Sequence, residues 1–367
     1  MTHSSAKAII DQFFHAEKAH RQDSRRRASA LAATVSLLAL VAACSSQNGS
    51  SSTQGSSSST LSLTVAGLTP AYSAPIYVAM TEGFFAKHHI DVTLIDNQPP
   101  GATNLVVSGR VDIATMAAAP QTLLLAEQGK QTYITYGGIR GGIGGSLLAR
   151  PGLTIASLQK LPNCRIATWP PGTSAYGWAI LYKKELGLNN CTFTIYNTPE
   201  LDTAAVASGR ADAVIGSSTN FAALVSDGKA DFLINTADAS DRAKYIPNPP
   251  AWEGVDYGLK SDLQKKATAV KAYYAGYQEA IAWMAAHGAA ATAAIVLKYQ
   301  AAKGLTLSQL TTSIAAITPF MAGGDVSQAS WDSSLKAYAT WGLTNFSSSN
   351  PLFAYGNMID TSAPAGS

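Results

Sequence analysis

The chain has 367 residues, of which 47% are hydrophobic and 13% are charged. This length allows two ordinary domains, and the composition is that of a globular protein with a large core, so disorder of the whole chain is excluded. Six of the 26 Lys and Arg residues and three of the 23 Asp and Glu residues precede Cys44, which leaves 20 of each sign after it. A neutral body without a basic cluster argues against nucleic-acid binding.

An apolar segment follows three arginines near the start of the chain. Residues 25–27 are Arg, and residues 28–43 are apolar or small, a stretch of about 16 residues that is shorter than a membrane-spanning helix and typical of a signal peptide. It ends in Leu-Val-Ala-Ala directly before Cys44, which resembles the bacterial lipobox, whose cysteine is diacylated and becomes the new N-terminus. The alternative is an uncleaved membrane anchor with Cys44 as a bystander. Both general secretory and twin-arginine export are compatible with this leader.

Residues 44–60 form a second segment with a composition of its own. After Cys44 they are almost entirely Ser, with Gln, Asn, Gly and Thr. Such a segment cannot bury enough apolar area to offset the entropy of ordering it, so we expect a flexible tether. The predicted location is therefore extracytoplasmic, with the protein anchored to the cell membrane through a lipid on Cys44.

The two remaining cysteines, Cys164 and Cys191, each open a short apolar run, with a helical stretch between them. If the runs are neighbouring parallel strands of one βαβ unit, their starts lie close enough for a disulfide. Disulfides persist outside the cytoplasm, so we predict a structural disulfide here. Two cysteines are too few for a metal site, and their spacing is not that of a redox C-x-x-C motif.

Strands and helices alternate after the tether. The expected elements are strands at 61–66, 91–95 and 112–116, and helices at 76–85 and 104–108. Alternation on this scale predicts an α/β protein with a mostly parallel sheet and helices on both faces. From Leu263 onward the sequence is helical, and Tyr273, Tyr277, Ile281 and Met284 have the spacing of a packed helix face.

A ten-residue pattern occurs twice, 100 residues apart. Residues 105–114 and 205–214 share Ser-Gly-Arg-x-Asp and its flanks. In both copies a helix ends, a glycine takes the left-handed C-cap, and Asp112 or Asp212 opens a strand that leads to a loop. The echo predicts two α/β lobes of similar plan.

Two segments are expected to cross between these lobes. Residues 136–145 are glycine-rich and indicate a hinge, with a mobile surface loop as the alternative. A second crossing is expected near 254–259, just after the proline-rich 246–250. We therefore assign residues 61–145 and 255–367 to lobe I and residues 146–254 to lobe II.

Four features occur in a familiar order along the body: residues 74–85, the two Ser-Gly-Arg-x-Asp copies, residues 171–174 before a helix, and the helical C-terminal part. In these features the body resembles the family of binding proteins for nitrate, sulfonates, taurine and thiamine pyrimidine precursors. It implies a two-lobed type II periplasmic-binding fold with ligand in the interlobe cleft. It also implies delivery of a small organic or anionic solute to the permease and ATPase of an ABC importer, by a monomer without a cofactor.

In open α/β sheets, ligands bind beyond the carboxyl ends of strands, near helix N-termini. Four loops fit that description: 68–75, 116–121, 170–176 and 216–220. Their polar, aromatic and small residues, together with one arginine near the hinge, give the candidate ligand contacts: Thr69, Tyr72, Ser73, Ala118, Pro120, Arg140, Thr173, Ser174, Tyr176, Ser217 and Asn220.

Several of these residues also have an ordinary structural explanation. Thr173 and Ser174 are residues that cap helices with or without a ligand, Tyr72 and Trp169 could be core residues, and Arg140 could be solvated. Arg140 is the candidate partner for a sulfonate. The scarcity of charge in the four loops favours a neutral or weakly polar ligand, or an anion held by backbone N–H groups and hydroxyls.

An enzyme on the same fold is the competing class, since the resemblance includes catalytic relatives. After the leader the only histidines are His88, His89 and His287, at expected helix ends away from the four loops and without metal-ligand spacing. We therefore expect a binder and not an enzyme. A surface lipoprotein that senses its ligand without transport stays as an alternative.

Overall fold

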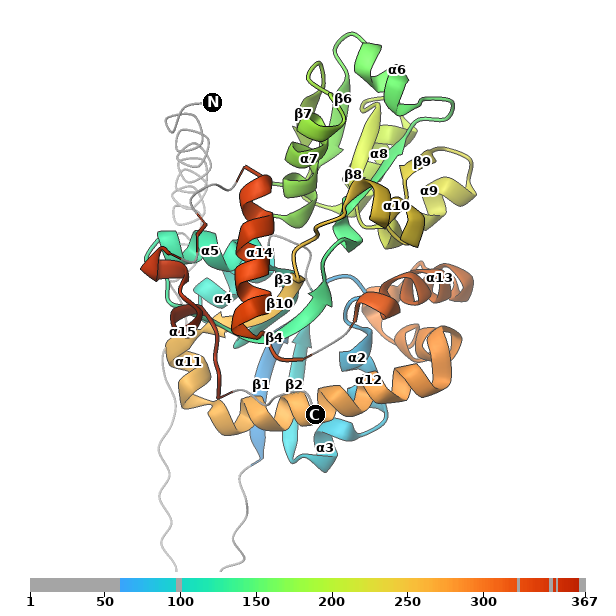
Figure 1. Ribbon diagram of the computed structural model, residues 1–367. Helices are drawn as coiled ribbons and strands as arrows, with labels where there is room; N and C mark the ends of the chain where they lie inside the picture. Colours follow the sequence, from blue (N-terminus) through green and yellow to red (C-terminus); the bar gives the residue numbers. More distant parts are fainter. Residues whose placement is uncertain (1–59, 97–100, 322–323, 343–345, 348, 363–367) are drawn as a thin grey trace, which may run out of the picture. The chain divides into compact units, whose positions relative to one another are not determined.

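The computed structural model describes residues 60–96, 101–321, 324–342, 346–347 and 349–362. The predicted leader, Cys44 and all of the tether except Thr60 lie outside these residues. Two five-stranded sheets organise the described part of the chain (Figure 1).

The first sheet has the strand order β2-β1-β3-β10-β4. Strand β1 pairs in parallel with β2 and β3, whereas β10 runs antiparallel to both β3 and β4. The strands are β1 (Leu61–Ala66), β2 (Ile90–Ile95), β3 (Ile113–Ala118), β4 (Thr132–Arg140) and β10 (Trp252–Leu259).

The second sheet repeats this plan with the order β7-β6-β8-β5-β9. Strand β6 pairs in parallel with β7 and β8, and β5 is antiparallel to β8 and β9. The strands are β5 (Ser146–Ala149), β6 (Arg165–Thr168), β7 (Thr192–Ile195), β8 (Ala213–Gly216) and β9 (Asp231–Ile234). The two lobes of similar plan predicted from the sequence echo are thus two sheets of the same topology.

Helices cover both faces of each sheet. They are α2 (Ala74–Thr81), α3 (Phe84–Lys87), α4 (Gly101–Val107), α5 (Ala119–Glu127), α6 (Ile155–Lys160), α7 (Ser174–Glu185), α8 (Pro199–Ala207), α9 (Ala222–Ser226), α10 (Ala239–Tyr245), α11 (Lys260–Lys265), α12 (Ala267–Val296), α13 (Leu307–Ile317), α14 (Gln328–Thr340) and α15 (Tyr355–Met358). Short 3₁₀ turns are η1 (Ile143–Gly145), η2 (Ser218–Asn220), η3 (Gln300–Ala302), η4 (Thr318–Phe320) and η5 (Pro351–Phe353).

Alternate strand residues supply the cores on the two faces. In β3, Ile113 packs into the cluster formed with α2 and α12, whereas its neighbour Ala114 packs into the cluster on the α4 and α5 side. In β6, Ile166 packs with α7 and Ala167 with α8. Because successive side chains of a strand point to opposite faces, each sheet needs helices on both sides to bury them. The α/β class and the fold predicted from the sequence are confirmed.

The long helix α12 is the one described helix whose length and apolar composition would suffice to cross a membrane. It runs beneath the first sheet in Figure 1 and buries Tyr273, Tyr274 and Tyr277 in the core. Its axis is interrupted at Gly288, where φ is 79°. These contacts are those of a core helix, as the spacing of its tyrosines predicted.

Two details of the chain path differ from the sequence expectations. The helix expected at 76–85 is two helices, because Gly83 between α2 and α3 has φ 77°. The crossing expected at 254–259 is strand β10, so the chain passes between the sheets at residues 246–251 instead. Since β10 begins at Trp252, residues 252–254 belong to the first sheet, and the assigned boundary at 254 lies within this strand.

The two copies of the repeated pattern, residues 105–114 and 205–214, have the same local structure. Gly109 and Gly209 have φ values of 69° and 74°, the left-handed conformation that was predicted. The Asp112 carboxylate accepts the backbone N–H of Thr64 at 2.9 Å, and the Asp212 carboxylate accepts that of Arg165 at 2.9 Å. Each aspartate thereby ties its own strand to the neighbouring parallel strand.

Replacing the C-cap glycine by alanine is expected to cost about 1 kcal/mol in either copy, because an L-residue is strained in the left-handed conformation. At Gly109 and Gly209 an added Cβ would meet no atom within 4 Å, so the backbone strain is the whole effect. Urea unfolding of Gly109→Ala and Gly209→Ala measures it. Gly356→Ala is the control, since that site is equally open and its φ is not positive; an equal loss there would contradict the explanation.

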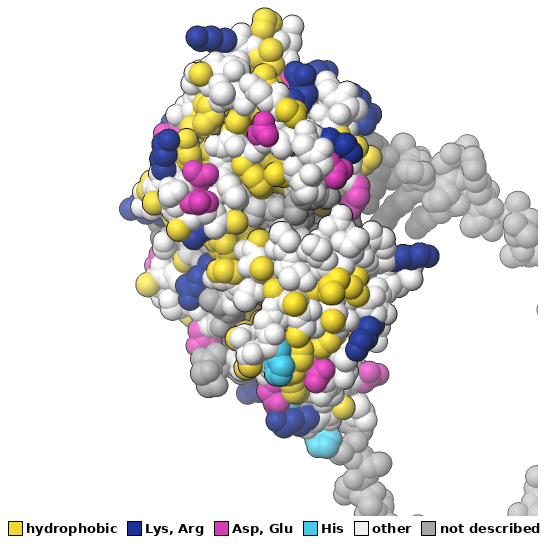
Figure 2. Space-filling view, turned by 90° about the vertical axis from the view of Figure 1, so that its right-hand side faces the viewer, with side chains coloured by type: hydrophobic (Ala, Val, Ile, Leu, Met, Phe, Trp, Pro, Cys, Tyr) yellow, Lys and Arg dark blue, Asp and Glu magenta, His cyan; other side chains and the backbone are white. Residues whose placement is uncertain are grey.

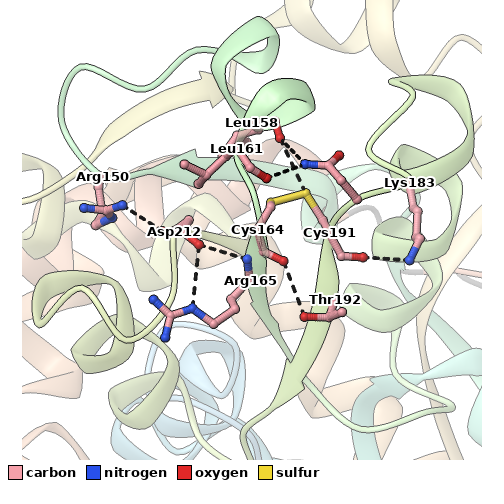
Figure 3. Close-up of a disulfide and its surroundings, with 10 residues drawn as sticks. Arg150, Leu158, Leu161, Cys164, Arg165, Lys183, Cys191, Thr192 and Asp212 are labelled. Carbon is pink, nitrogen blue, oxygen red and sulfur yellow. Dashed lines mark hydrogen bonds and ion pairs between the residues drawn. A yellow bond between two sulfur atoms is a disulfide. The ribbon is translucent and has the colours of Figure 1, made fainter.

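A disulfide joins Cys164 and Cys191, with their Cα atoms 4.2 Å apart. Each cysteine directly precedes a strand, and Arg165 of β6 pairs with Thr192 of β7 in parallel register. Figure 3 shows the sulfur bridge next to Asp212, whose carboxylate also pairs with Arg150 at 2.7 Å. The predicted pairing and its geometric reason are both confirmed.

Helix α14 connects the two sheets on the side of the crossing segments. The Tyr338 hydroxyl donates to the carbonyl of Trp252 in β10. Three residues further on, at the C-cap of the same helix, the centre of the Trp341 ring lies 4.8 Å from that of Trp178 in α7. The C-terminal part of the chain, assigned to lobe I, therefore also packs against lobe II.

Candidate functional site

A cavity of about 80 Å³ lies among the loops that follow the strands of both sheets. A water molecule needs roughly 10–15 Å³ in this measure, so the cavity has room for a small solute. Its walls are Leu68, Thr69 and Tyr72 after β1; Ala102; Met116, Ala117 and Ala118 of β3; Gln121; Ile139; Ile143 and Gly144; Trp169, Thr173, Ser174 and Ala175; Gly216, Ser217 and Asn220; and Glu253 and Gly254 of β10.

All four loops predicted from the sequence contribute to this cavity. Seven of the eleven candidate residues line it: Thr69, Tyr72, Ala118, Thr173, Ser174, Ser217 and Asn220. They come from strand ends and helix starts of both sheets, as expected for an open α/β fold. Trp169, for which the sequence left core and cleft open, also lines the cavity.

The other four candidates lie elsewhere. The Ser73 hydroxyl is fully buried and accepts the N–H of Leu68 at 3.1 Å. Pro120 is buried in the first turn of α5. The guanidinium of Arg140 lies 5.4 Å from the centre of the Trp252 ring, and the Tyr176 ring packs edge-on against Phe193. Arg140, the cation suggested for a sulfonate, is thus not part of the cavity wall.

The start of α7 is built by local hydrogen bonds. Thr173 is its N-cap: its hydroxyl accepts the N–H of Tyr176 at 3.3 Å and donates to the carbonyl of Pro170 at 2.8 Å. This capping is the structural role that the sequence already allowed for Thr173. It turns the first residues of α7, among them Ser174 and Ala175, toward the cavity.

The Tyr72 side chain reaches across the cavity from the first sheet to the second. Burial raises the pKa of Tyr72, and hydrogen bonding to Ser217 and Thr219 partly offsets this rise. A second contact across the two halves lies on α13, where the Ser313 hydroxyl donates to the carbonyl of Thr219 at 3.0 Å. Tyr72 and Ser313, which both belong to the half of the chain with the first sheet, therefore contact the loop around η2.

Glu253 is a wall residue that the sequence analysis missed. Its carboxylate accepts the backbone N–H of Gly142 at 2.6 Å, that of Gly144 at 2.9 Å and the indole N–H of Trp178 at 3.2 Å. Burial raises the pKa of Glu253 to about 7 in spite of these donors. Glu253 thereby ties β10, the first crossing segment and α7 together at the edge of the cavity.

Asp256 supports the floor of the cavity from below. Its carboxylate accepts the N–H of Met116 at 2.7 Å and the hydroxyl of Thr115 at 2.8 Å, and the Tyr274 hydroxyl donates to it at 3.3 Å. Met116 has φ 50°, an uncommon conformation for a residue other than glycine. The buried carboxylate holds this strained turn of the strand at the point where β3 meets the cavity.

Trp169 is positioned by a second buried acid. Its indole N–H donates to one oxygen of Asp202 at 2.8 Å, and the other oxygen is buried without a hydrogen-bond partner. Burial raises the pKa of Asp202 to about 8, since a low-polarity environment penalises the charged form. Asp202 is 1% exposed, so the protonated form is favoured at neutral pH.

Asp202 is expected to make stability fall as pH rises. Its folded pKa of about 8 exceeds the usual 3.8, so between these values the folded chain holds a proton that the unfolded chain has lost. Asp202→Asn removes this titration. Between pH 5 and about pH 8.5 the wild type is expected to lose stability that the variant keeps. The difference in unfolding free energy, variant minus wild type, therefore rises by about 1 kcal/mol or more over this range. Urea unfolding across this range measures it, with Asp227→Asn, an exposed acid outside α8, as control; an unchanged difference would contradict the assignment.

None of the three histidines after the leader is among the residues that line the cavity. His88 lies 2.6 Å from Glu279 at the molecular surface, and the His287 ring stacks on Trp283. Within the described residues no group of three or more His, Cys, Asp or Glu side chains could hold a metal ion. On the face shown in Figure 2, Lys and Arg are interspersed with Asp and Glu, and the described residues form no continuous basic area there.

Three solved structures illustrate what this fold resembles. The periplasmic aliphatic sulphonate-binding protein of Escherichia coli has a TM-score of 0.64 and 13% identity, over 83% of this chain and 94% of its own. The periplasmic nitrate-binding protein of Synechocystis has a TM-score of 0.65 and 14% identity, over 83% and 87%. The ligand-binding component of an ABC-type import system from Staphylococcus aureus has a TM-score of 0.65 and 16% identity, over 83% and 97%.

At these identities the likeness is one of fold. No curated protein matches the sequence significantly. The NMT1/THI5-like family matches residues 70–291, which include every wall of the cavity except Leu68 and Thr69. This match covers more than half of the chain, and the chain therefore belongs to the NMT1/THI5-like family.

Proposed function

We propose that this protein binds a small solute in the cavity between its two sheets outside the cell and delivers it to an ABC importer. The observation that carries the proposal is a cavity walled by loops of both sheets, with Thr69 and Tyr72 on one side and Ser174, Ser217 and Asn220 on the other. A solute that contacts both sides stabilises the arrangement in which the two lobes are together.

Closure about the two crossing segments is the proposed signal to the permease. The first crossing is residues 141–145, because residues 136–140 of the segment predicted as a hinge belong to β4. It is rich in glycine and is held by Glu253. The second, residues 246–251, precedes β10. Few chain segments have to change their dihedral angles when lobes joined in this way open and close.

The proposed lobes are residues 61–145 and 252–367 for lobe I and residues 146–251 for lobe II, which moves the boundary predicted at 254 to the start of β10. The seven cavity residues named above are the proposed ligand contacts. Ser73, Pro120, Arg140 and Tyr176 lie outside the cavity wall, and we no longer propose direct contact for them.

The proposed location is the outer face of the cell membrane. The leader and the Leu-Val-Ala-Ala-Cys sequence at 40–44 support cleavage before Cys44 and its lipidation. The Ser-rich residues 45–60 would give the folded part freedom to reach the permease. Mass spectrometry of the membrane-bound protein tests this, because the proposal expects an N-terminal diacylated Cys44 and is contradicted by an intact leader.

Binding itself is tested by a thermal-shift screen of the chain beginning at Cys44, produced without lipid. The screen contains alkanesulfonates, taurine, nitrate, hydroxymethylpyrimidines and aromatic acids and alcohols. A ligand at about 100 times its dissociation constant adds roughly 2.7 kcal/mol of stability. A dose-dependent shift with one class supports the proposal, and a folded protein that responds to no class contradicts it.

A further inference from the structure

The charge on the cavity wall indicates what the cavity accepts. We propose that it binds an uncharged or positively charged organic solute with an apolar body, and that Glu253 disfavours sulfonates, carboxylates and nitrate. This inference rests on the proposed function and names the class of its solute.

The wall residues carry one ionisable acid and no base. Glu253 is 3% exposed and lies on the wall, and none of the residues that form the wall is Lys, Arg or His. The two arginines closest in sequence to the crossing segments are engaged elsewhere. Arg140 stacks on Trp252, and Arg242 donates to the carbonyl of Thr236 at 2.6 Å while lying over the Phe320 ring. An anion in the cavity would therefore meet a carboxylate without a compensating cation.

The N-terminus of α7 could attract an anion, but the Glu253 carboxylate already lies beside it. Helix α7 has 12 residues, and its N-terminus carries a partial positive charge toward the cavity. Two side chains of α7 are directed to Glu253: the Trp178 indole donates at 3.2 Å, and hydrogen bonding by Ser174 lowers the pKa of Glu253. Glu253 thus already accepts from side chains in the first two turns of α7, and an anionic ligand at this helix start would lie beside a carboxylate on the same wall.

The donors around Glu253 also indicate its charge. Gly142, Gly144 and Trp178 each donate an N–H and cannot accept a proton from a carboxylic acid. A shell of donors is suited to the carboxylate. Because the protein itself supplies these hydrogen bonds, Glu253 does not need the ligand as a partner. It acts on the ligand through its charge above its pKa of about 7, so the titrations that test this are made at pH 8.

The remainder of the wall suits an apolar body with a few polar groups. Leu68, Met116, Ile139, Ile143 and Trp169 supply apolar contact area. Hydroxyls and amides stand among them at Thr69, Gln121, Ser217 and Asn220. Such a wall can hydrogen-bond a hydroxyl, an amine or a ring nitrogen, which is the pattern of a site for small organic molecules.

The test compares solutes that share a body and differ in charge. One series is benzyl alcohol, benzylamine and benzoate; the other is ethylene glycol, ethanolamine and isethionate; nitrate is added alone. Calorimetric titration of the chain beginning at Cys44 is expected to show an uncharged or cationic member binding at least about tenfold tighter than its anion, the effect of about 1.4 kcal/mol. Benzoate, isethionate or nitrate binding as tightly as the other members would overturn the charge inference and leave the proposed function standing. No binding by any member would count against both.

Two variants test the role of Glu253. Glu253→Gln is expected to reduce the ratio of the dissociation constant of benzoate to that of benzyl alcohol by about tenfold, mainly because benzoate binds more tightly. Asn220→Lys places a cation on the wall without touching the hydrogen bonds of Glu253, and is expected to shift the ratio in the same direction, which keeps the inference testable if Glu253→Gln folds poorly. Glu200→Gln, on the exposed side of α8, is the control. An unchanged ratio in both Glu253→Gln and Asn220→Lys would contradict the inference.

Discussion

Replacing both Cys164 and Cys191 by alanine is expected to lower the free energy of unfolding by about 3.5 kcal/mol, because the disulfide closes a loop with a sequence separation of 27 residues. The cross-link restricts the unfolded chain, and its loss restores that conformational freedom. Both cysteines are fully buried, so alanine adds no polar group, and the space left by the two sulfur atoms adds to the loss.

Urea unfolding at equilibrium measures this loss as a lower midpoint. Cys44→Ala in the unlipidated protein is the matched control, since it removes a cysteine outside the described residues. A midpoint that is the same for the double variant and the control would mean that the disulfide does not contribute to stability. Reduction of the wild-type protein before unfolding should reproduce the loss.

Asp256→Ala is expected to cost about 3–4 kcal/mol, which places it among the most destabilising single changes in this chain. The substitution leaves the N–H of Met116 and the hydroxyls of Thr115 and Tyr274 without their acceptor in a buried site. Burial also raises the pKa of Asp256 to about 7. The loss is therefore expected to grow as pH falls from about 7 toward 3.8, because over this range the folded wild-type chain keeps a proton that the unfolded chain has lost.

The same variant should weaken solute binding, because the left-handed turn at Met116 loses the hydrogen bond that holds it at the cavity floor. Asp256→Asn keeps the shape and one acceptor, and should retain more of both stability and binding. Asp227→Ala is the control, as Asp227 is exposed and pairs only with Lys229 among the contacts described. Equal effects of Asp256→Ala and Asp227→Ala would contradict the role assigned to Asp256.

Much of the fold followed from local chemistry in the sequence. The left-handed glycines at 109 and 209 and the aspartates three residues later predicted two matching lobes, because a C-cap and the following strand start depend on neighbouring residues. The disulfide was predictable once Cys164 and Cys191 were recognised as the starts of adjacent parallel strands. The four cavity loops were predictable because each follows the carboxyl end of a strand, and strand ends can be located from neighbouring residues.

The charged residues of the site were not predicted, because their partners are far away in the sequence. Glu253 meets Gly142, 111 residues before it, and Asp256 meets Met116, 140 residues before it. Both acids interrupt the apolar run that forms β10, and this interruption was the signal available in the sequence. The sequence analysis considered charge only in the four loops and near the hinge, and so selected Arg140, which packs on Trp252 instead.

The central claim is that a solute binds in the cavity between the two sheets. The most direct measurement is calorimetric titration of the tightest-binding solute into wild type, Ala118→Phe and Ala239→Phe. Ala118 lines the cavity, so a phenyl ring there occupies the space of the solute, whereas Ala239 is exposed at the start of α10. The account predicts affinity at least about 100-fold weaker for Ala118→Phe, a difference of about 2.7 kcal/mol, and unchanged affinity for Ala239→Phe. Undiminished binding by a folded Ala118→Phe protein would place the solute elsewhere and contradict the account.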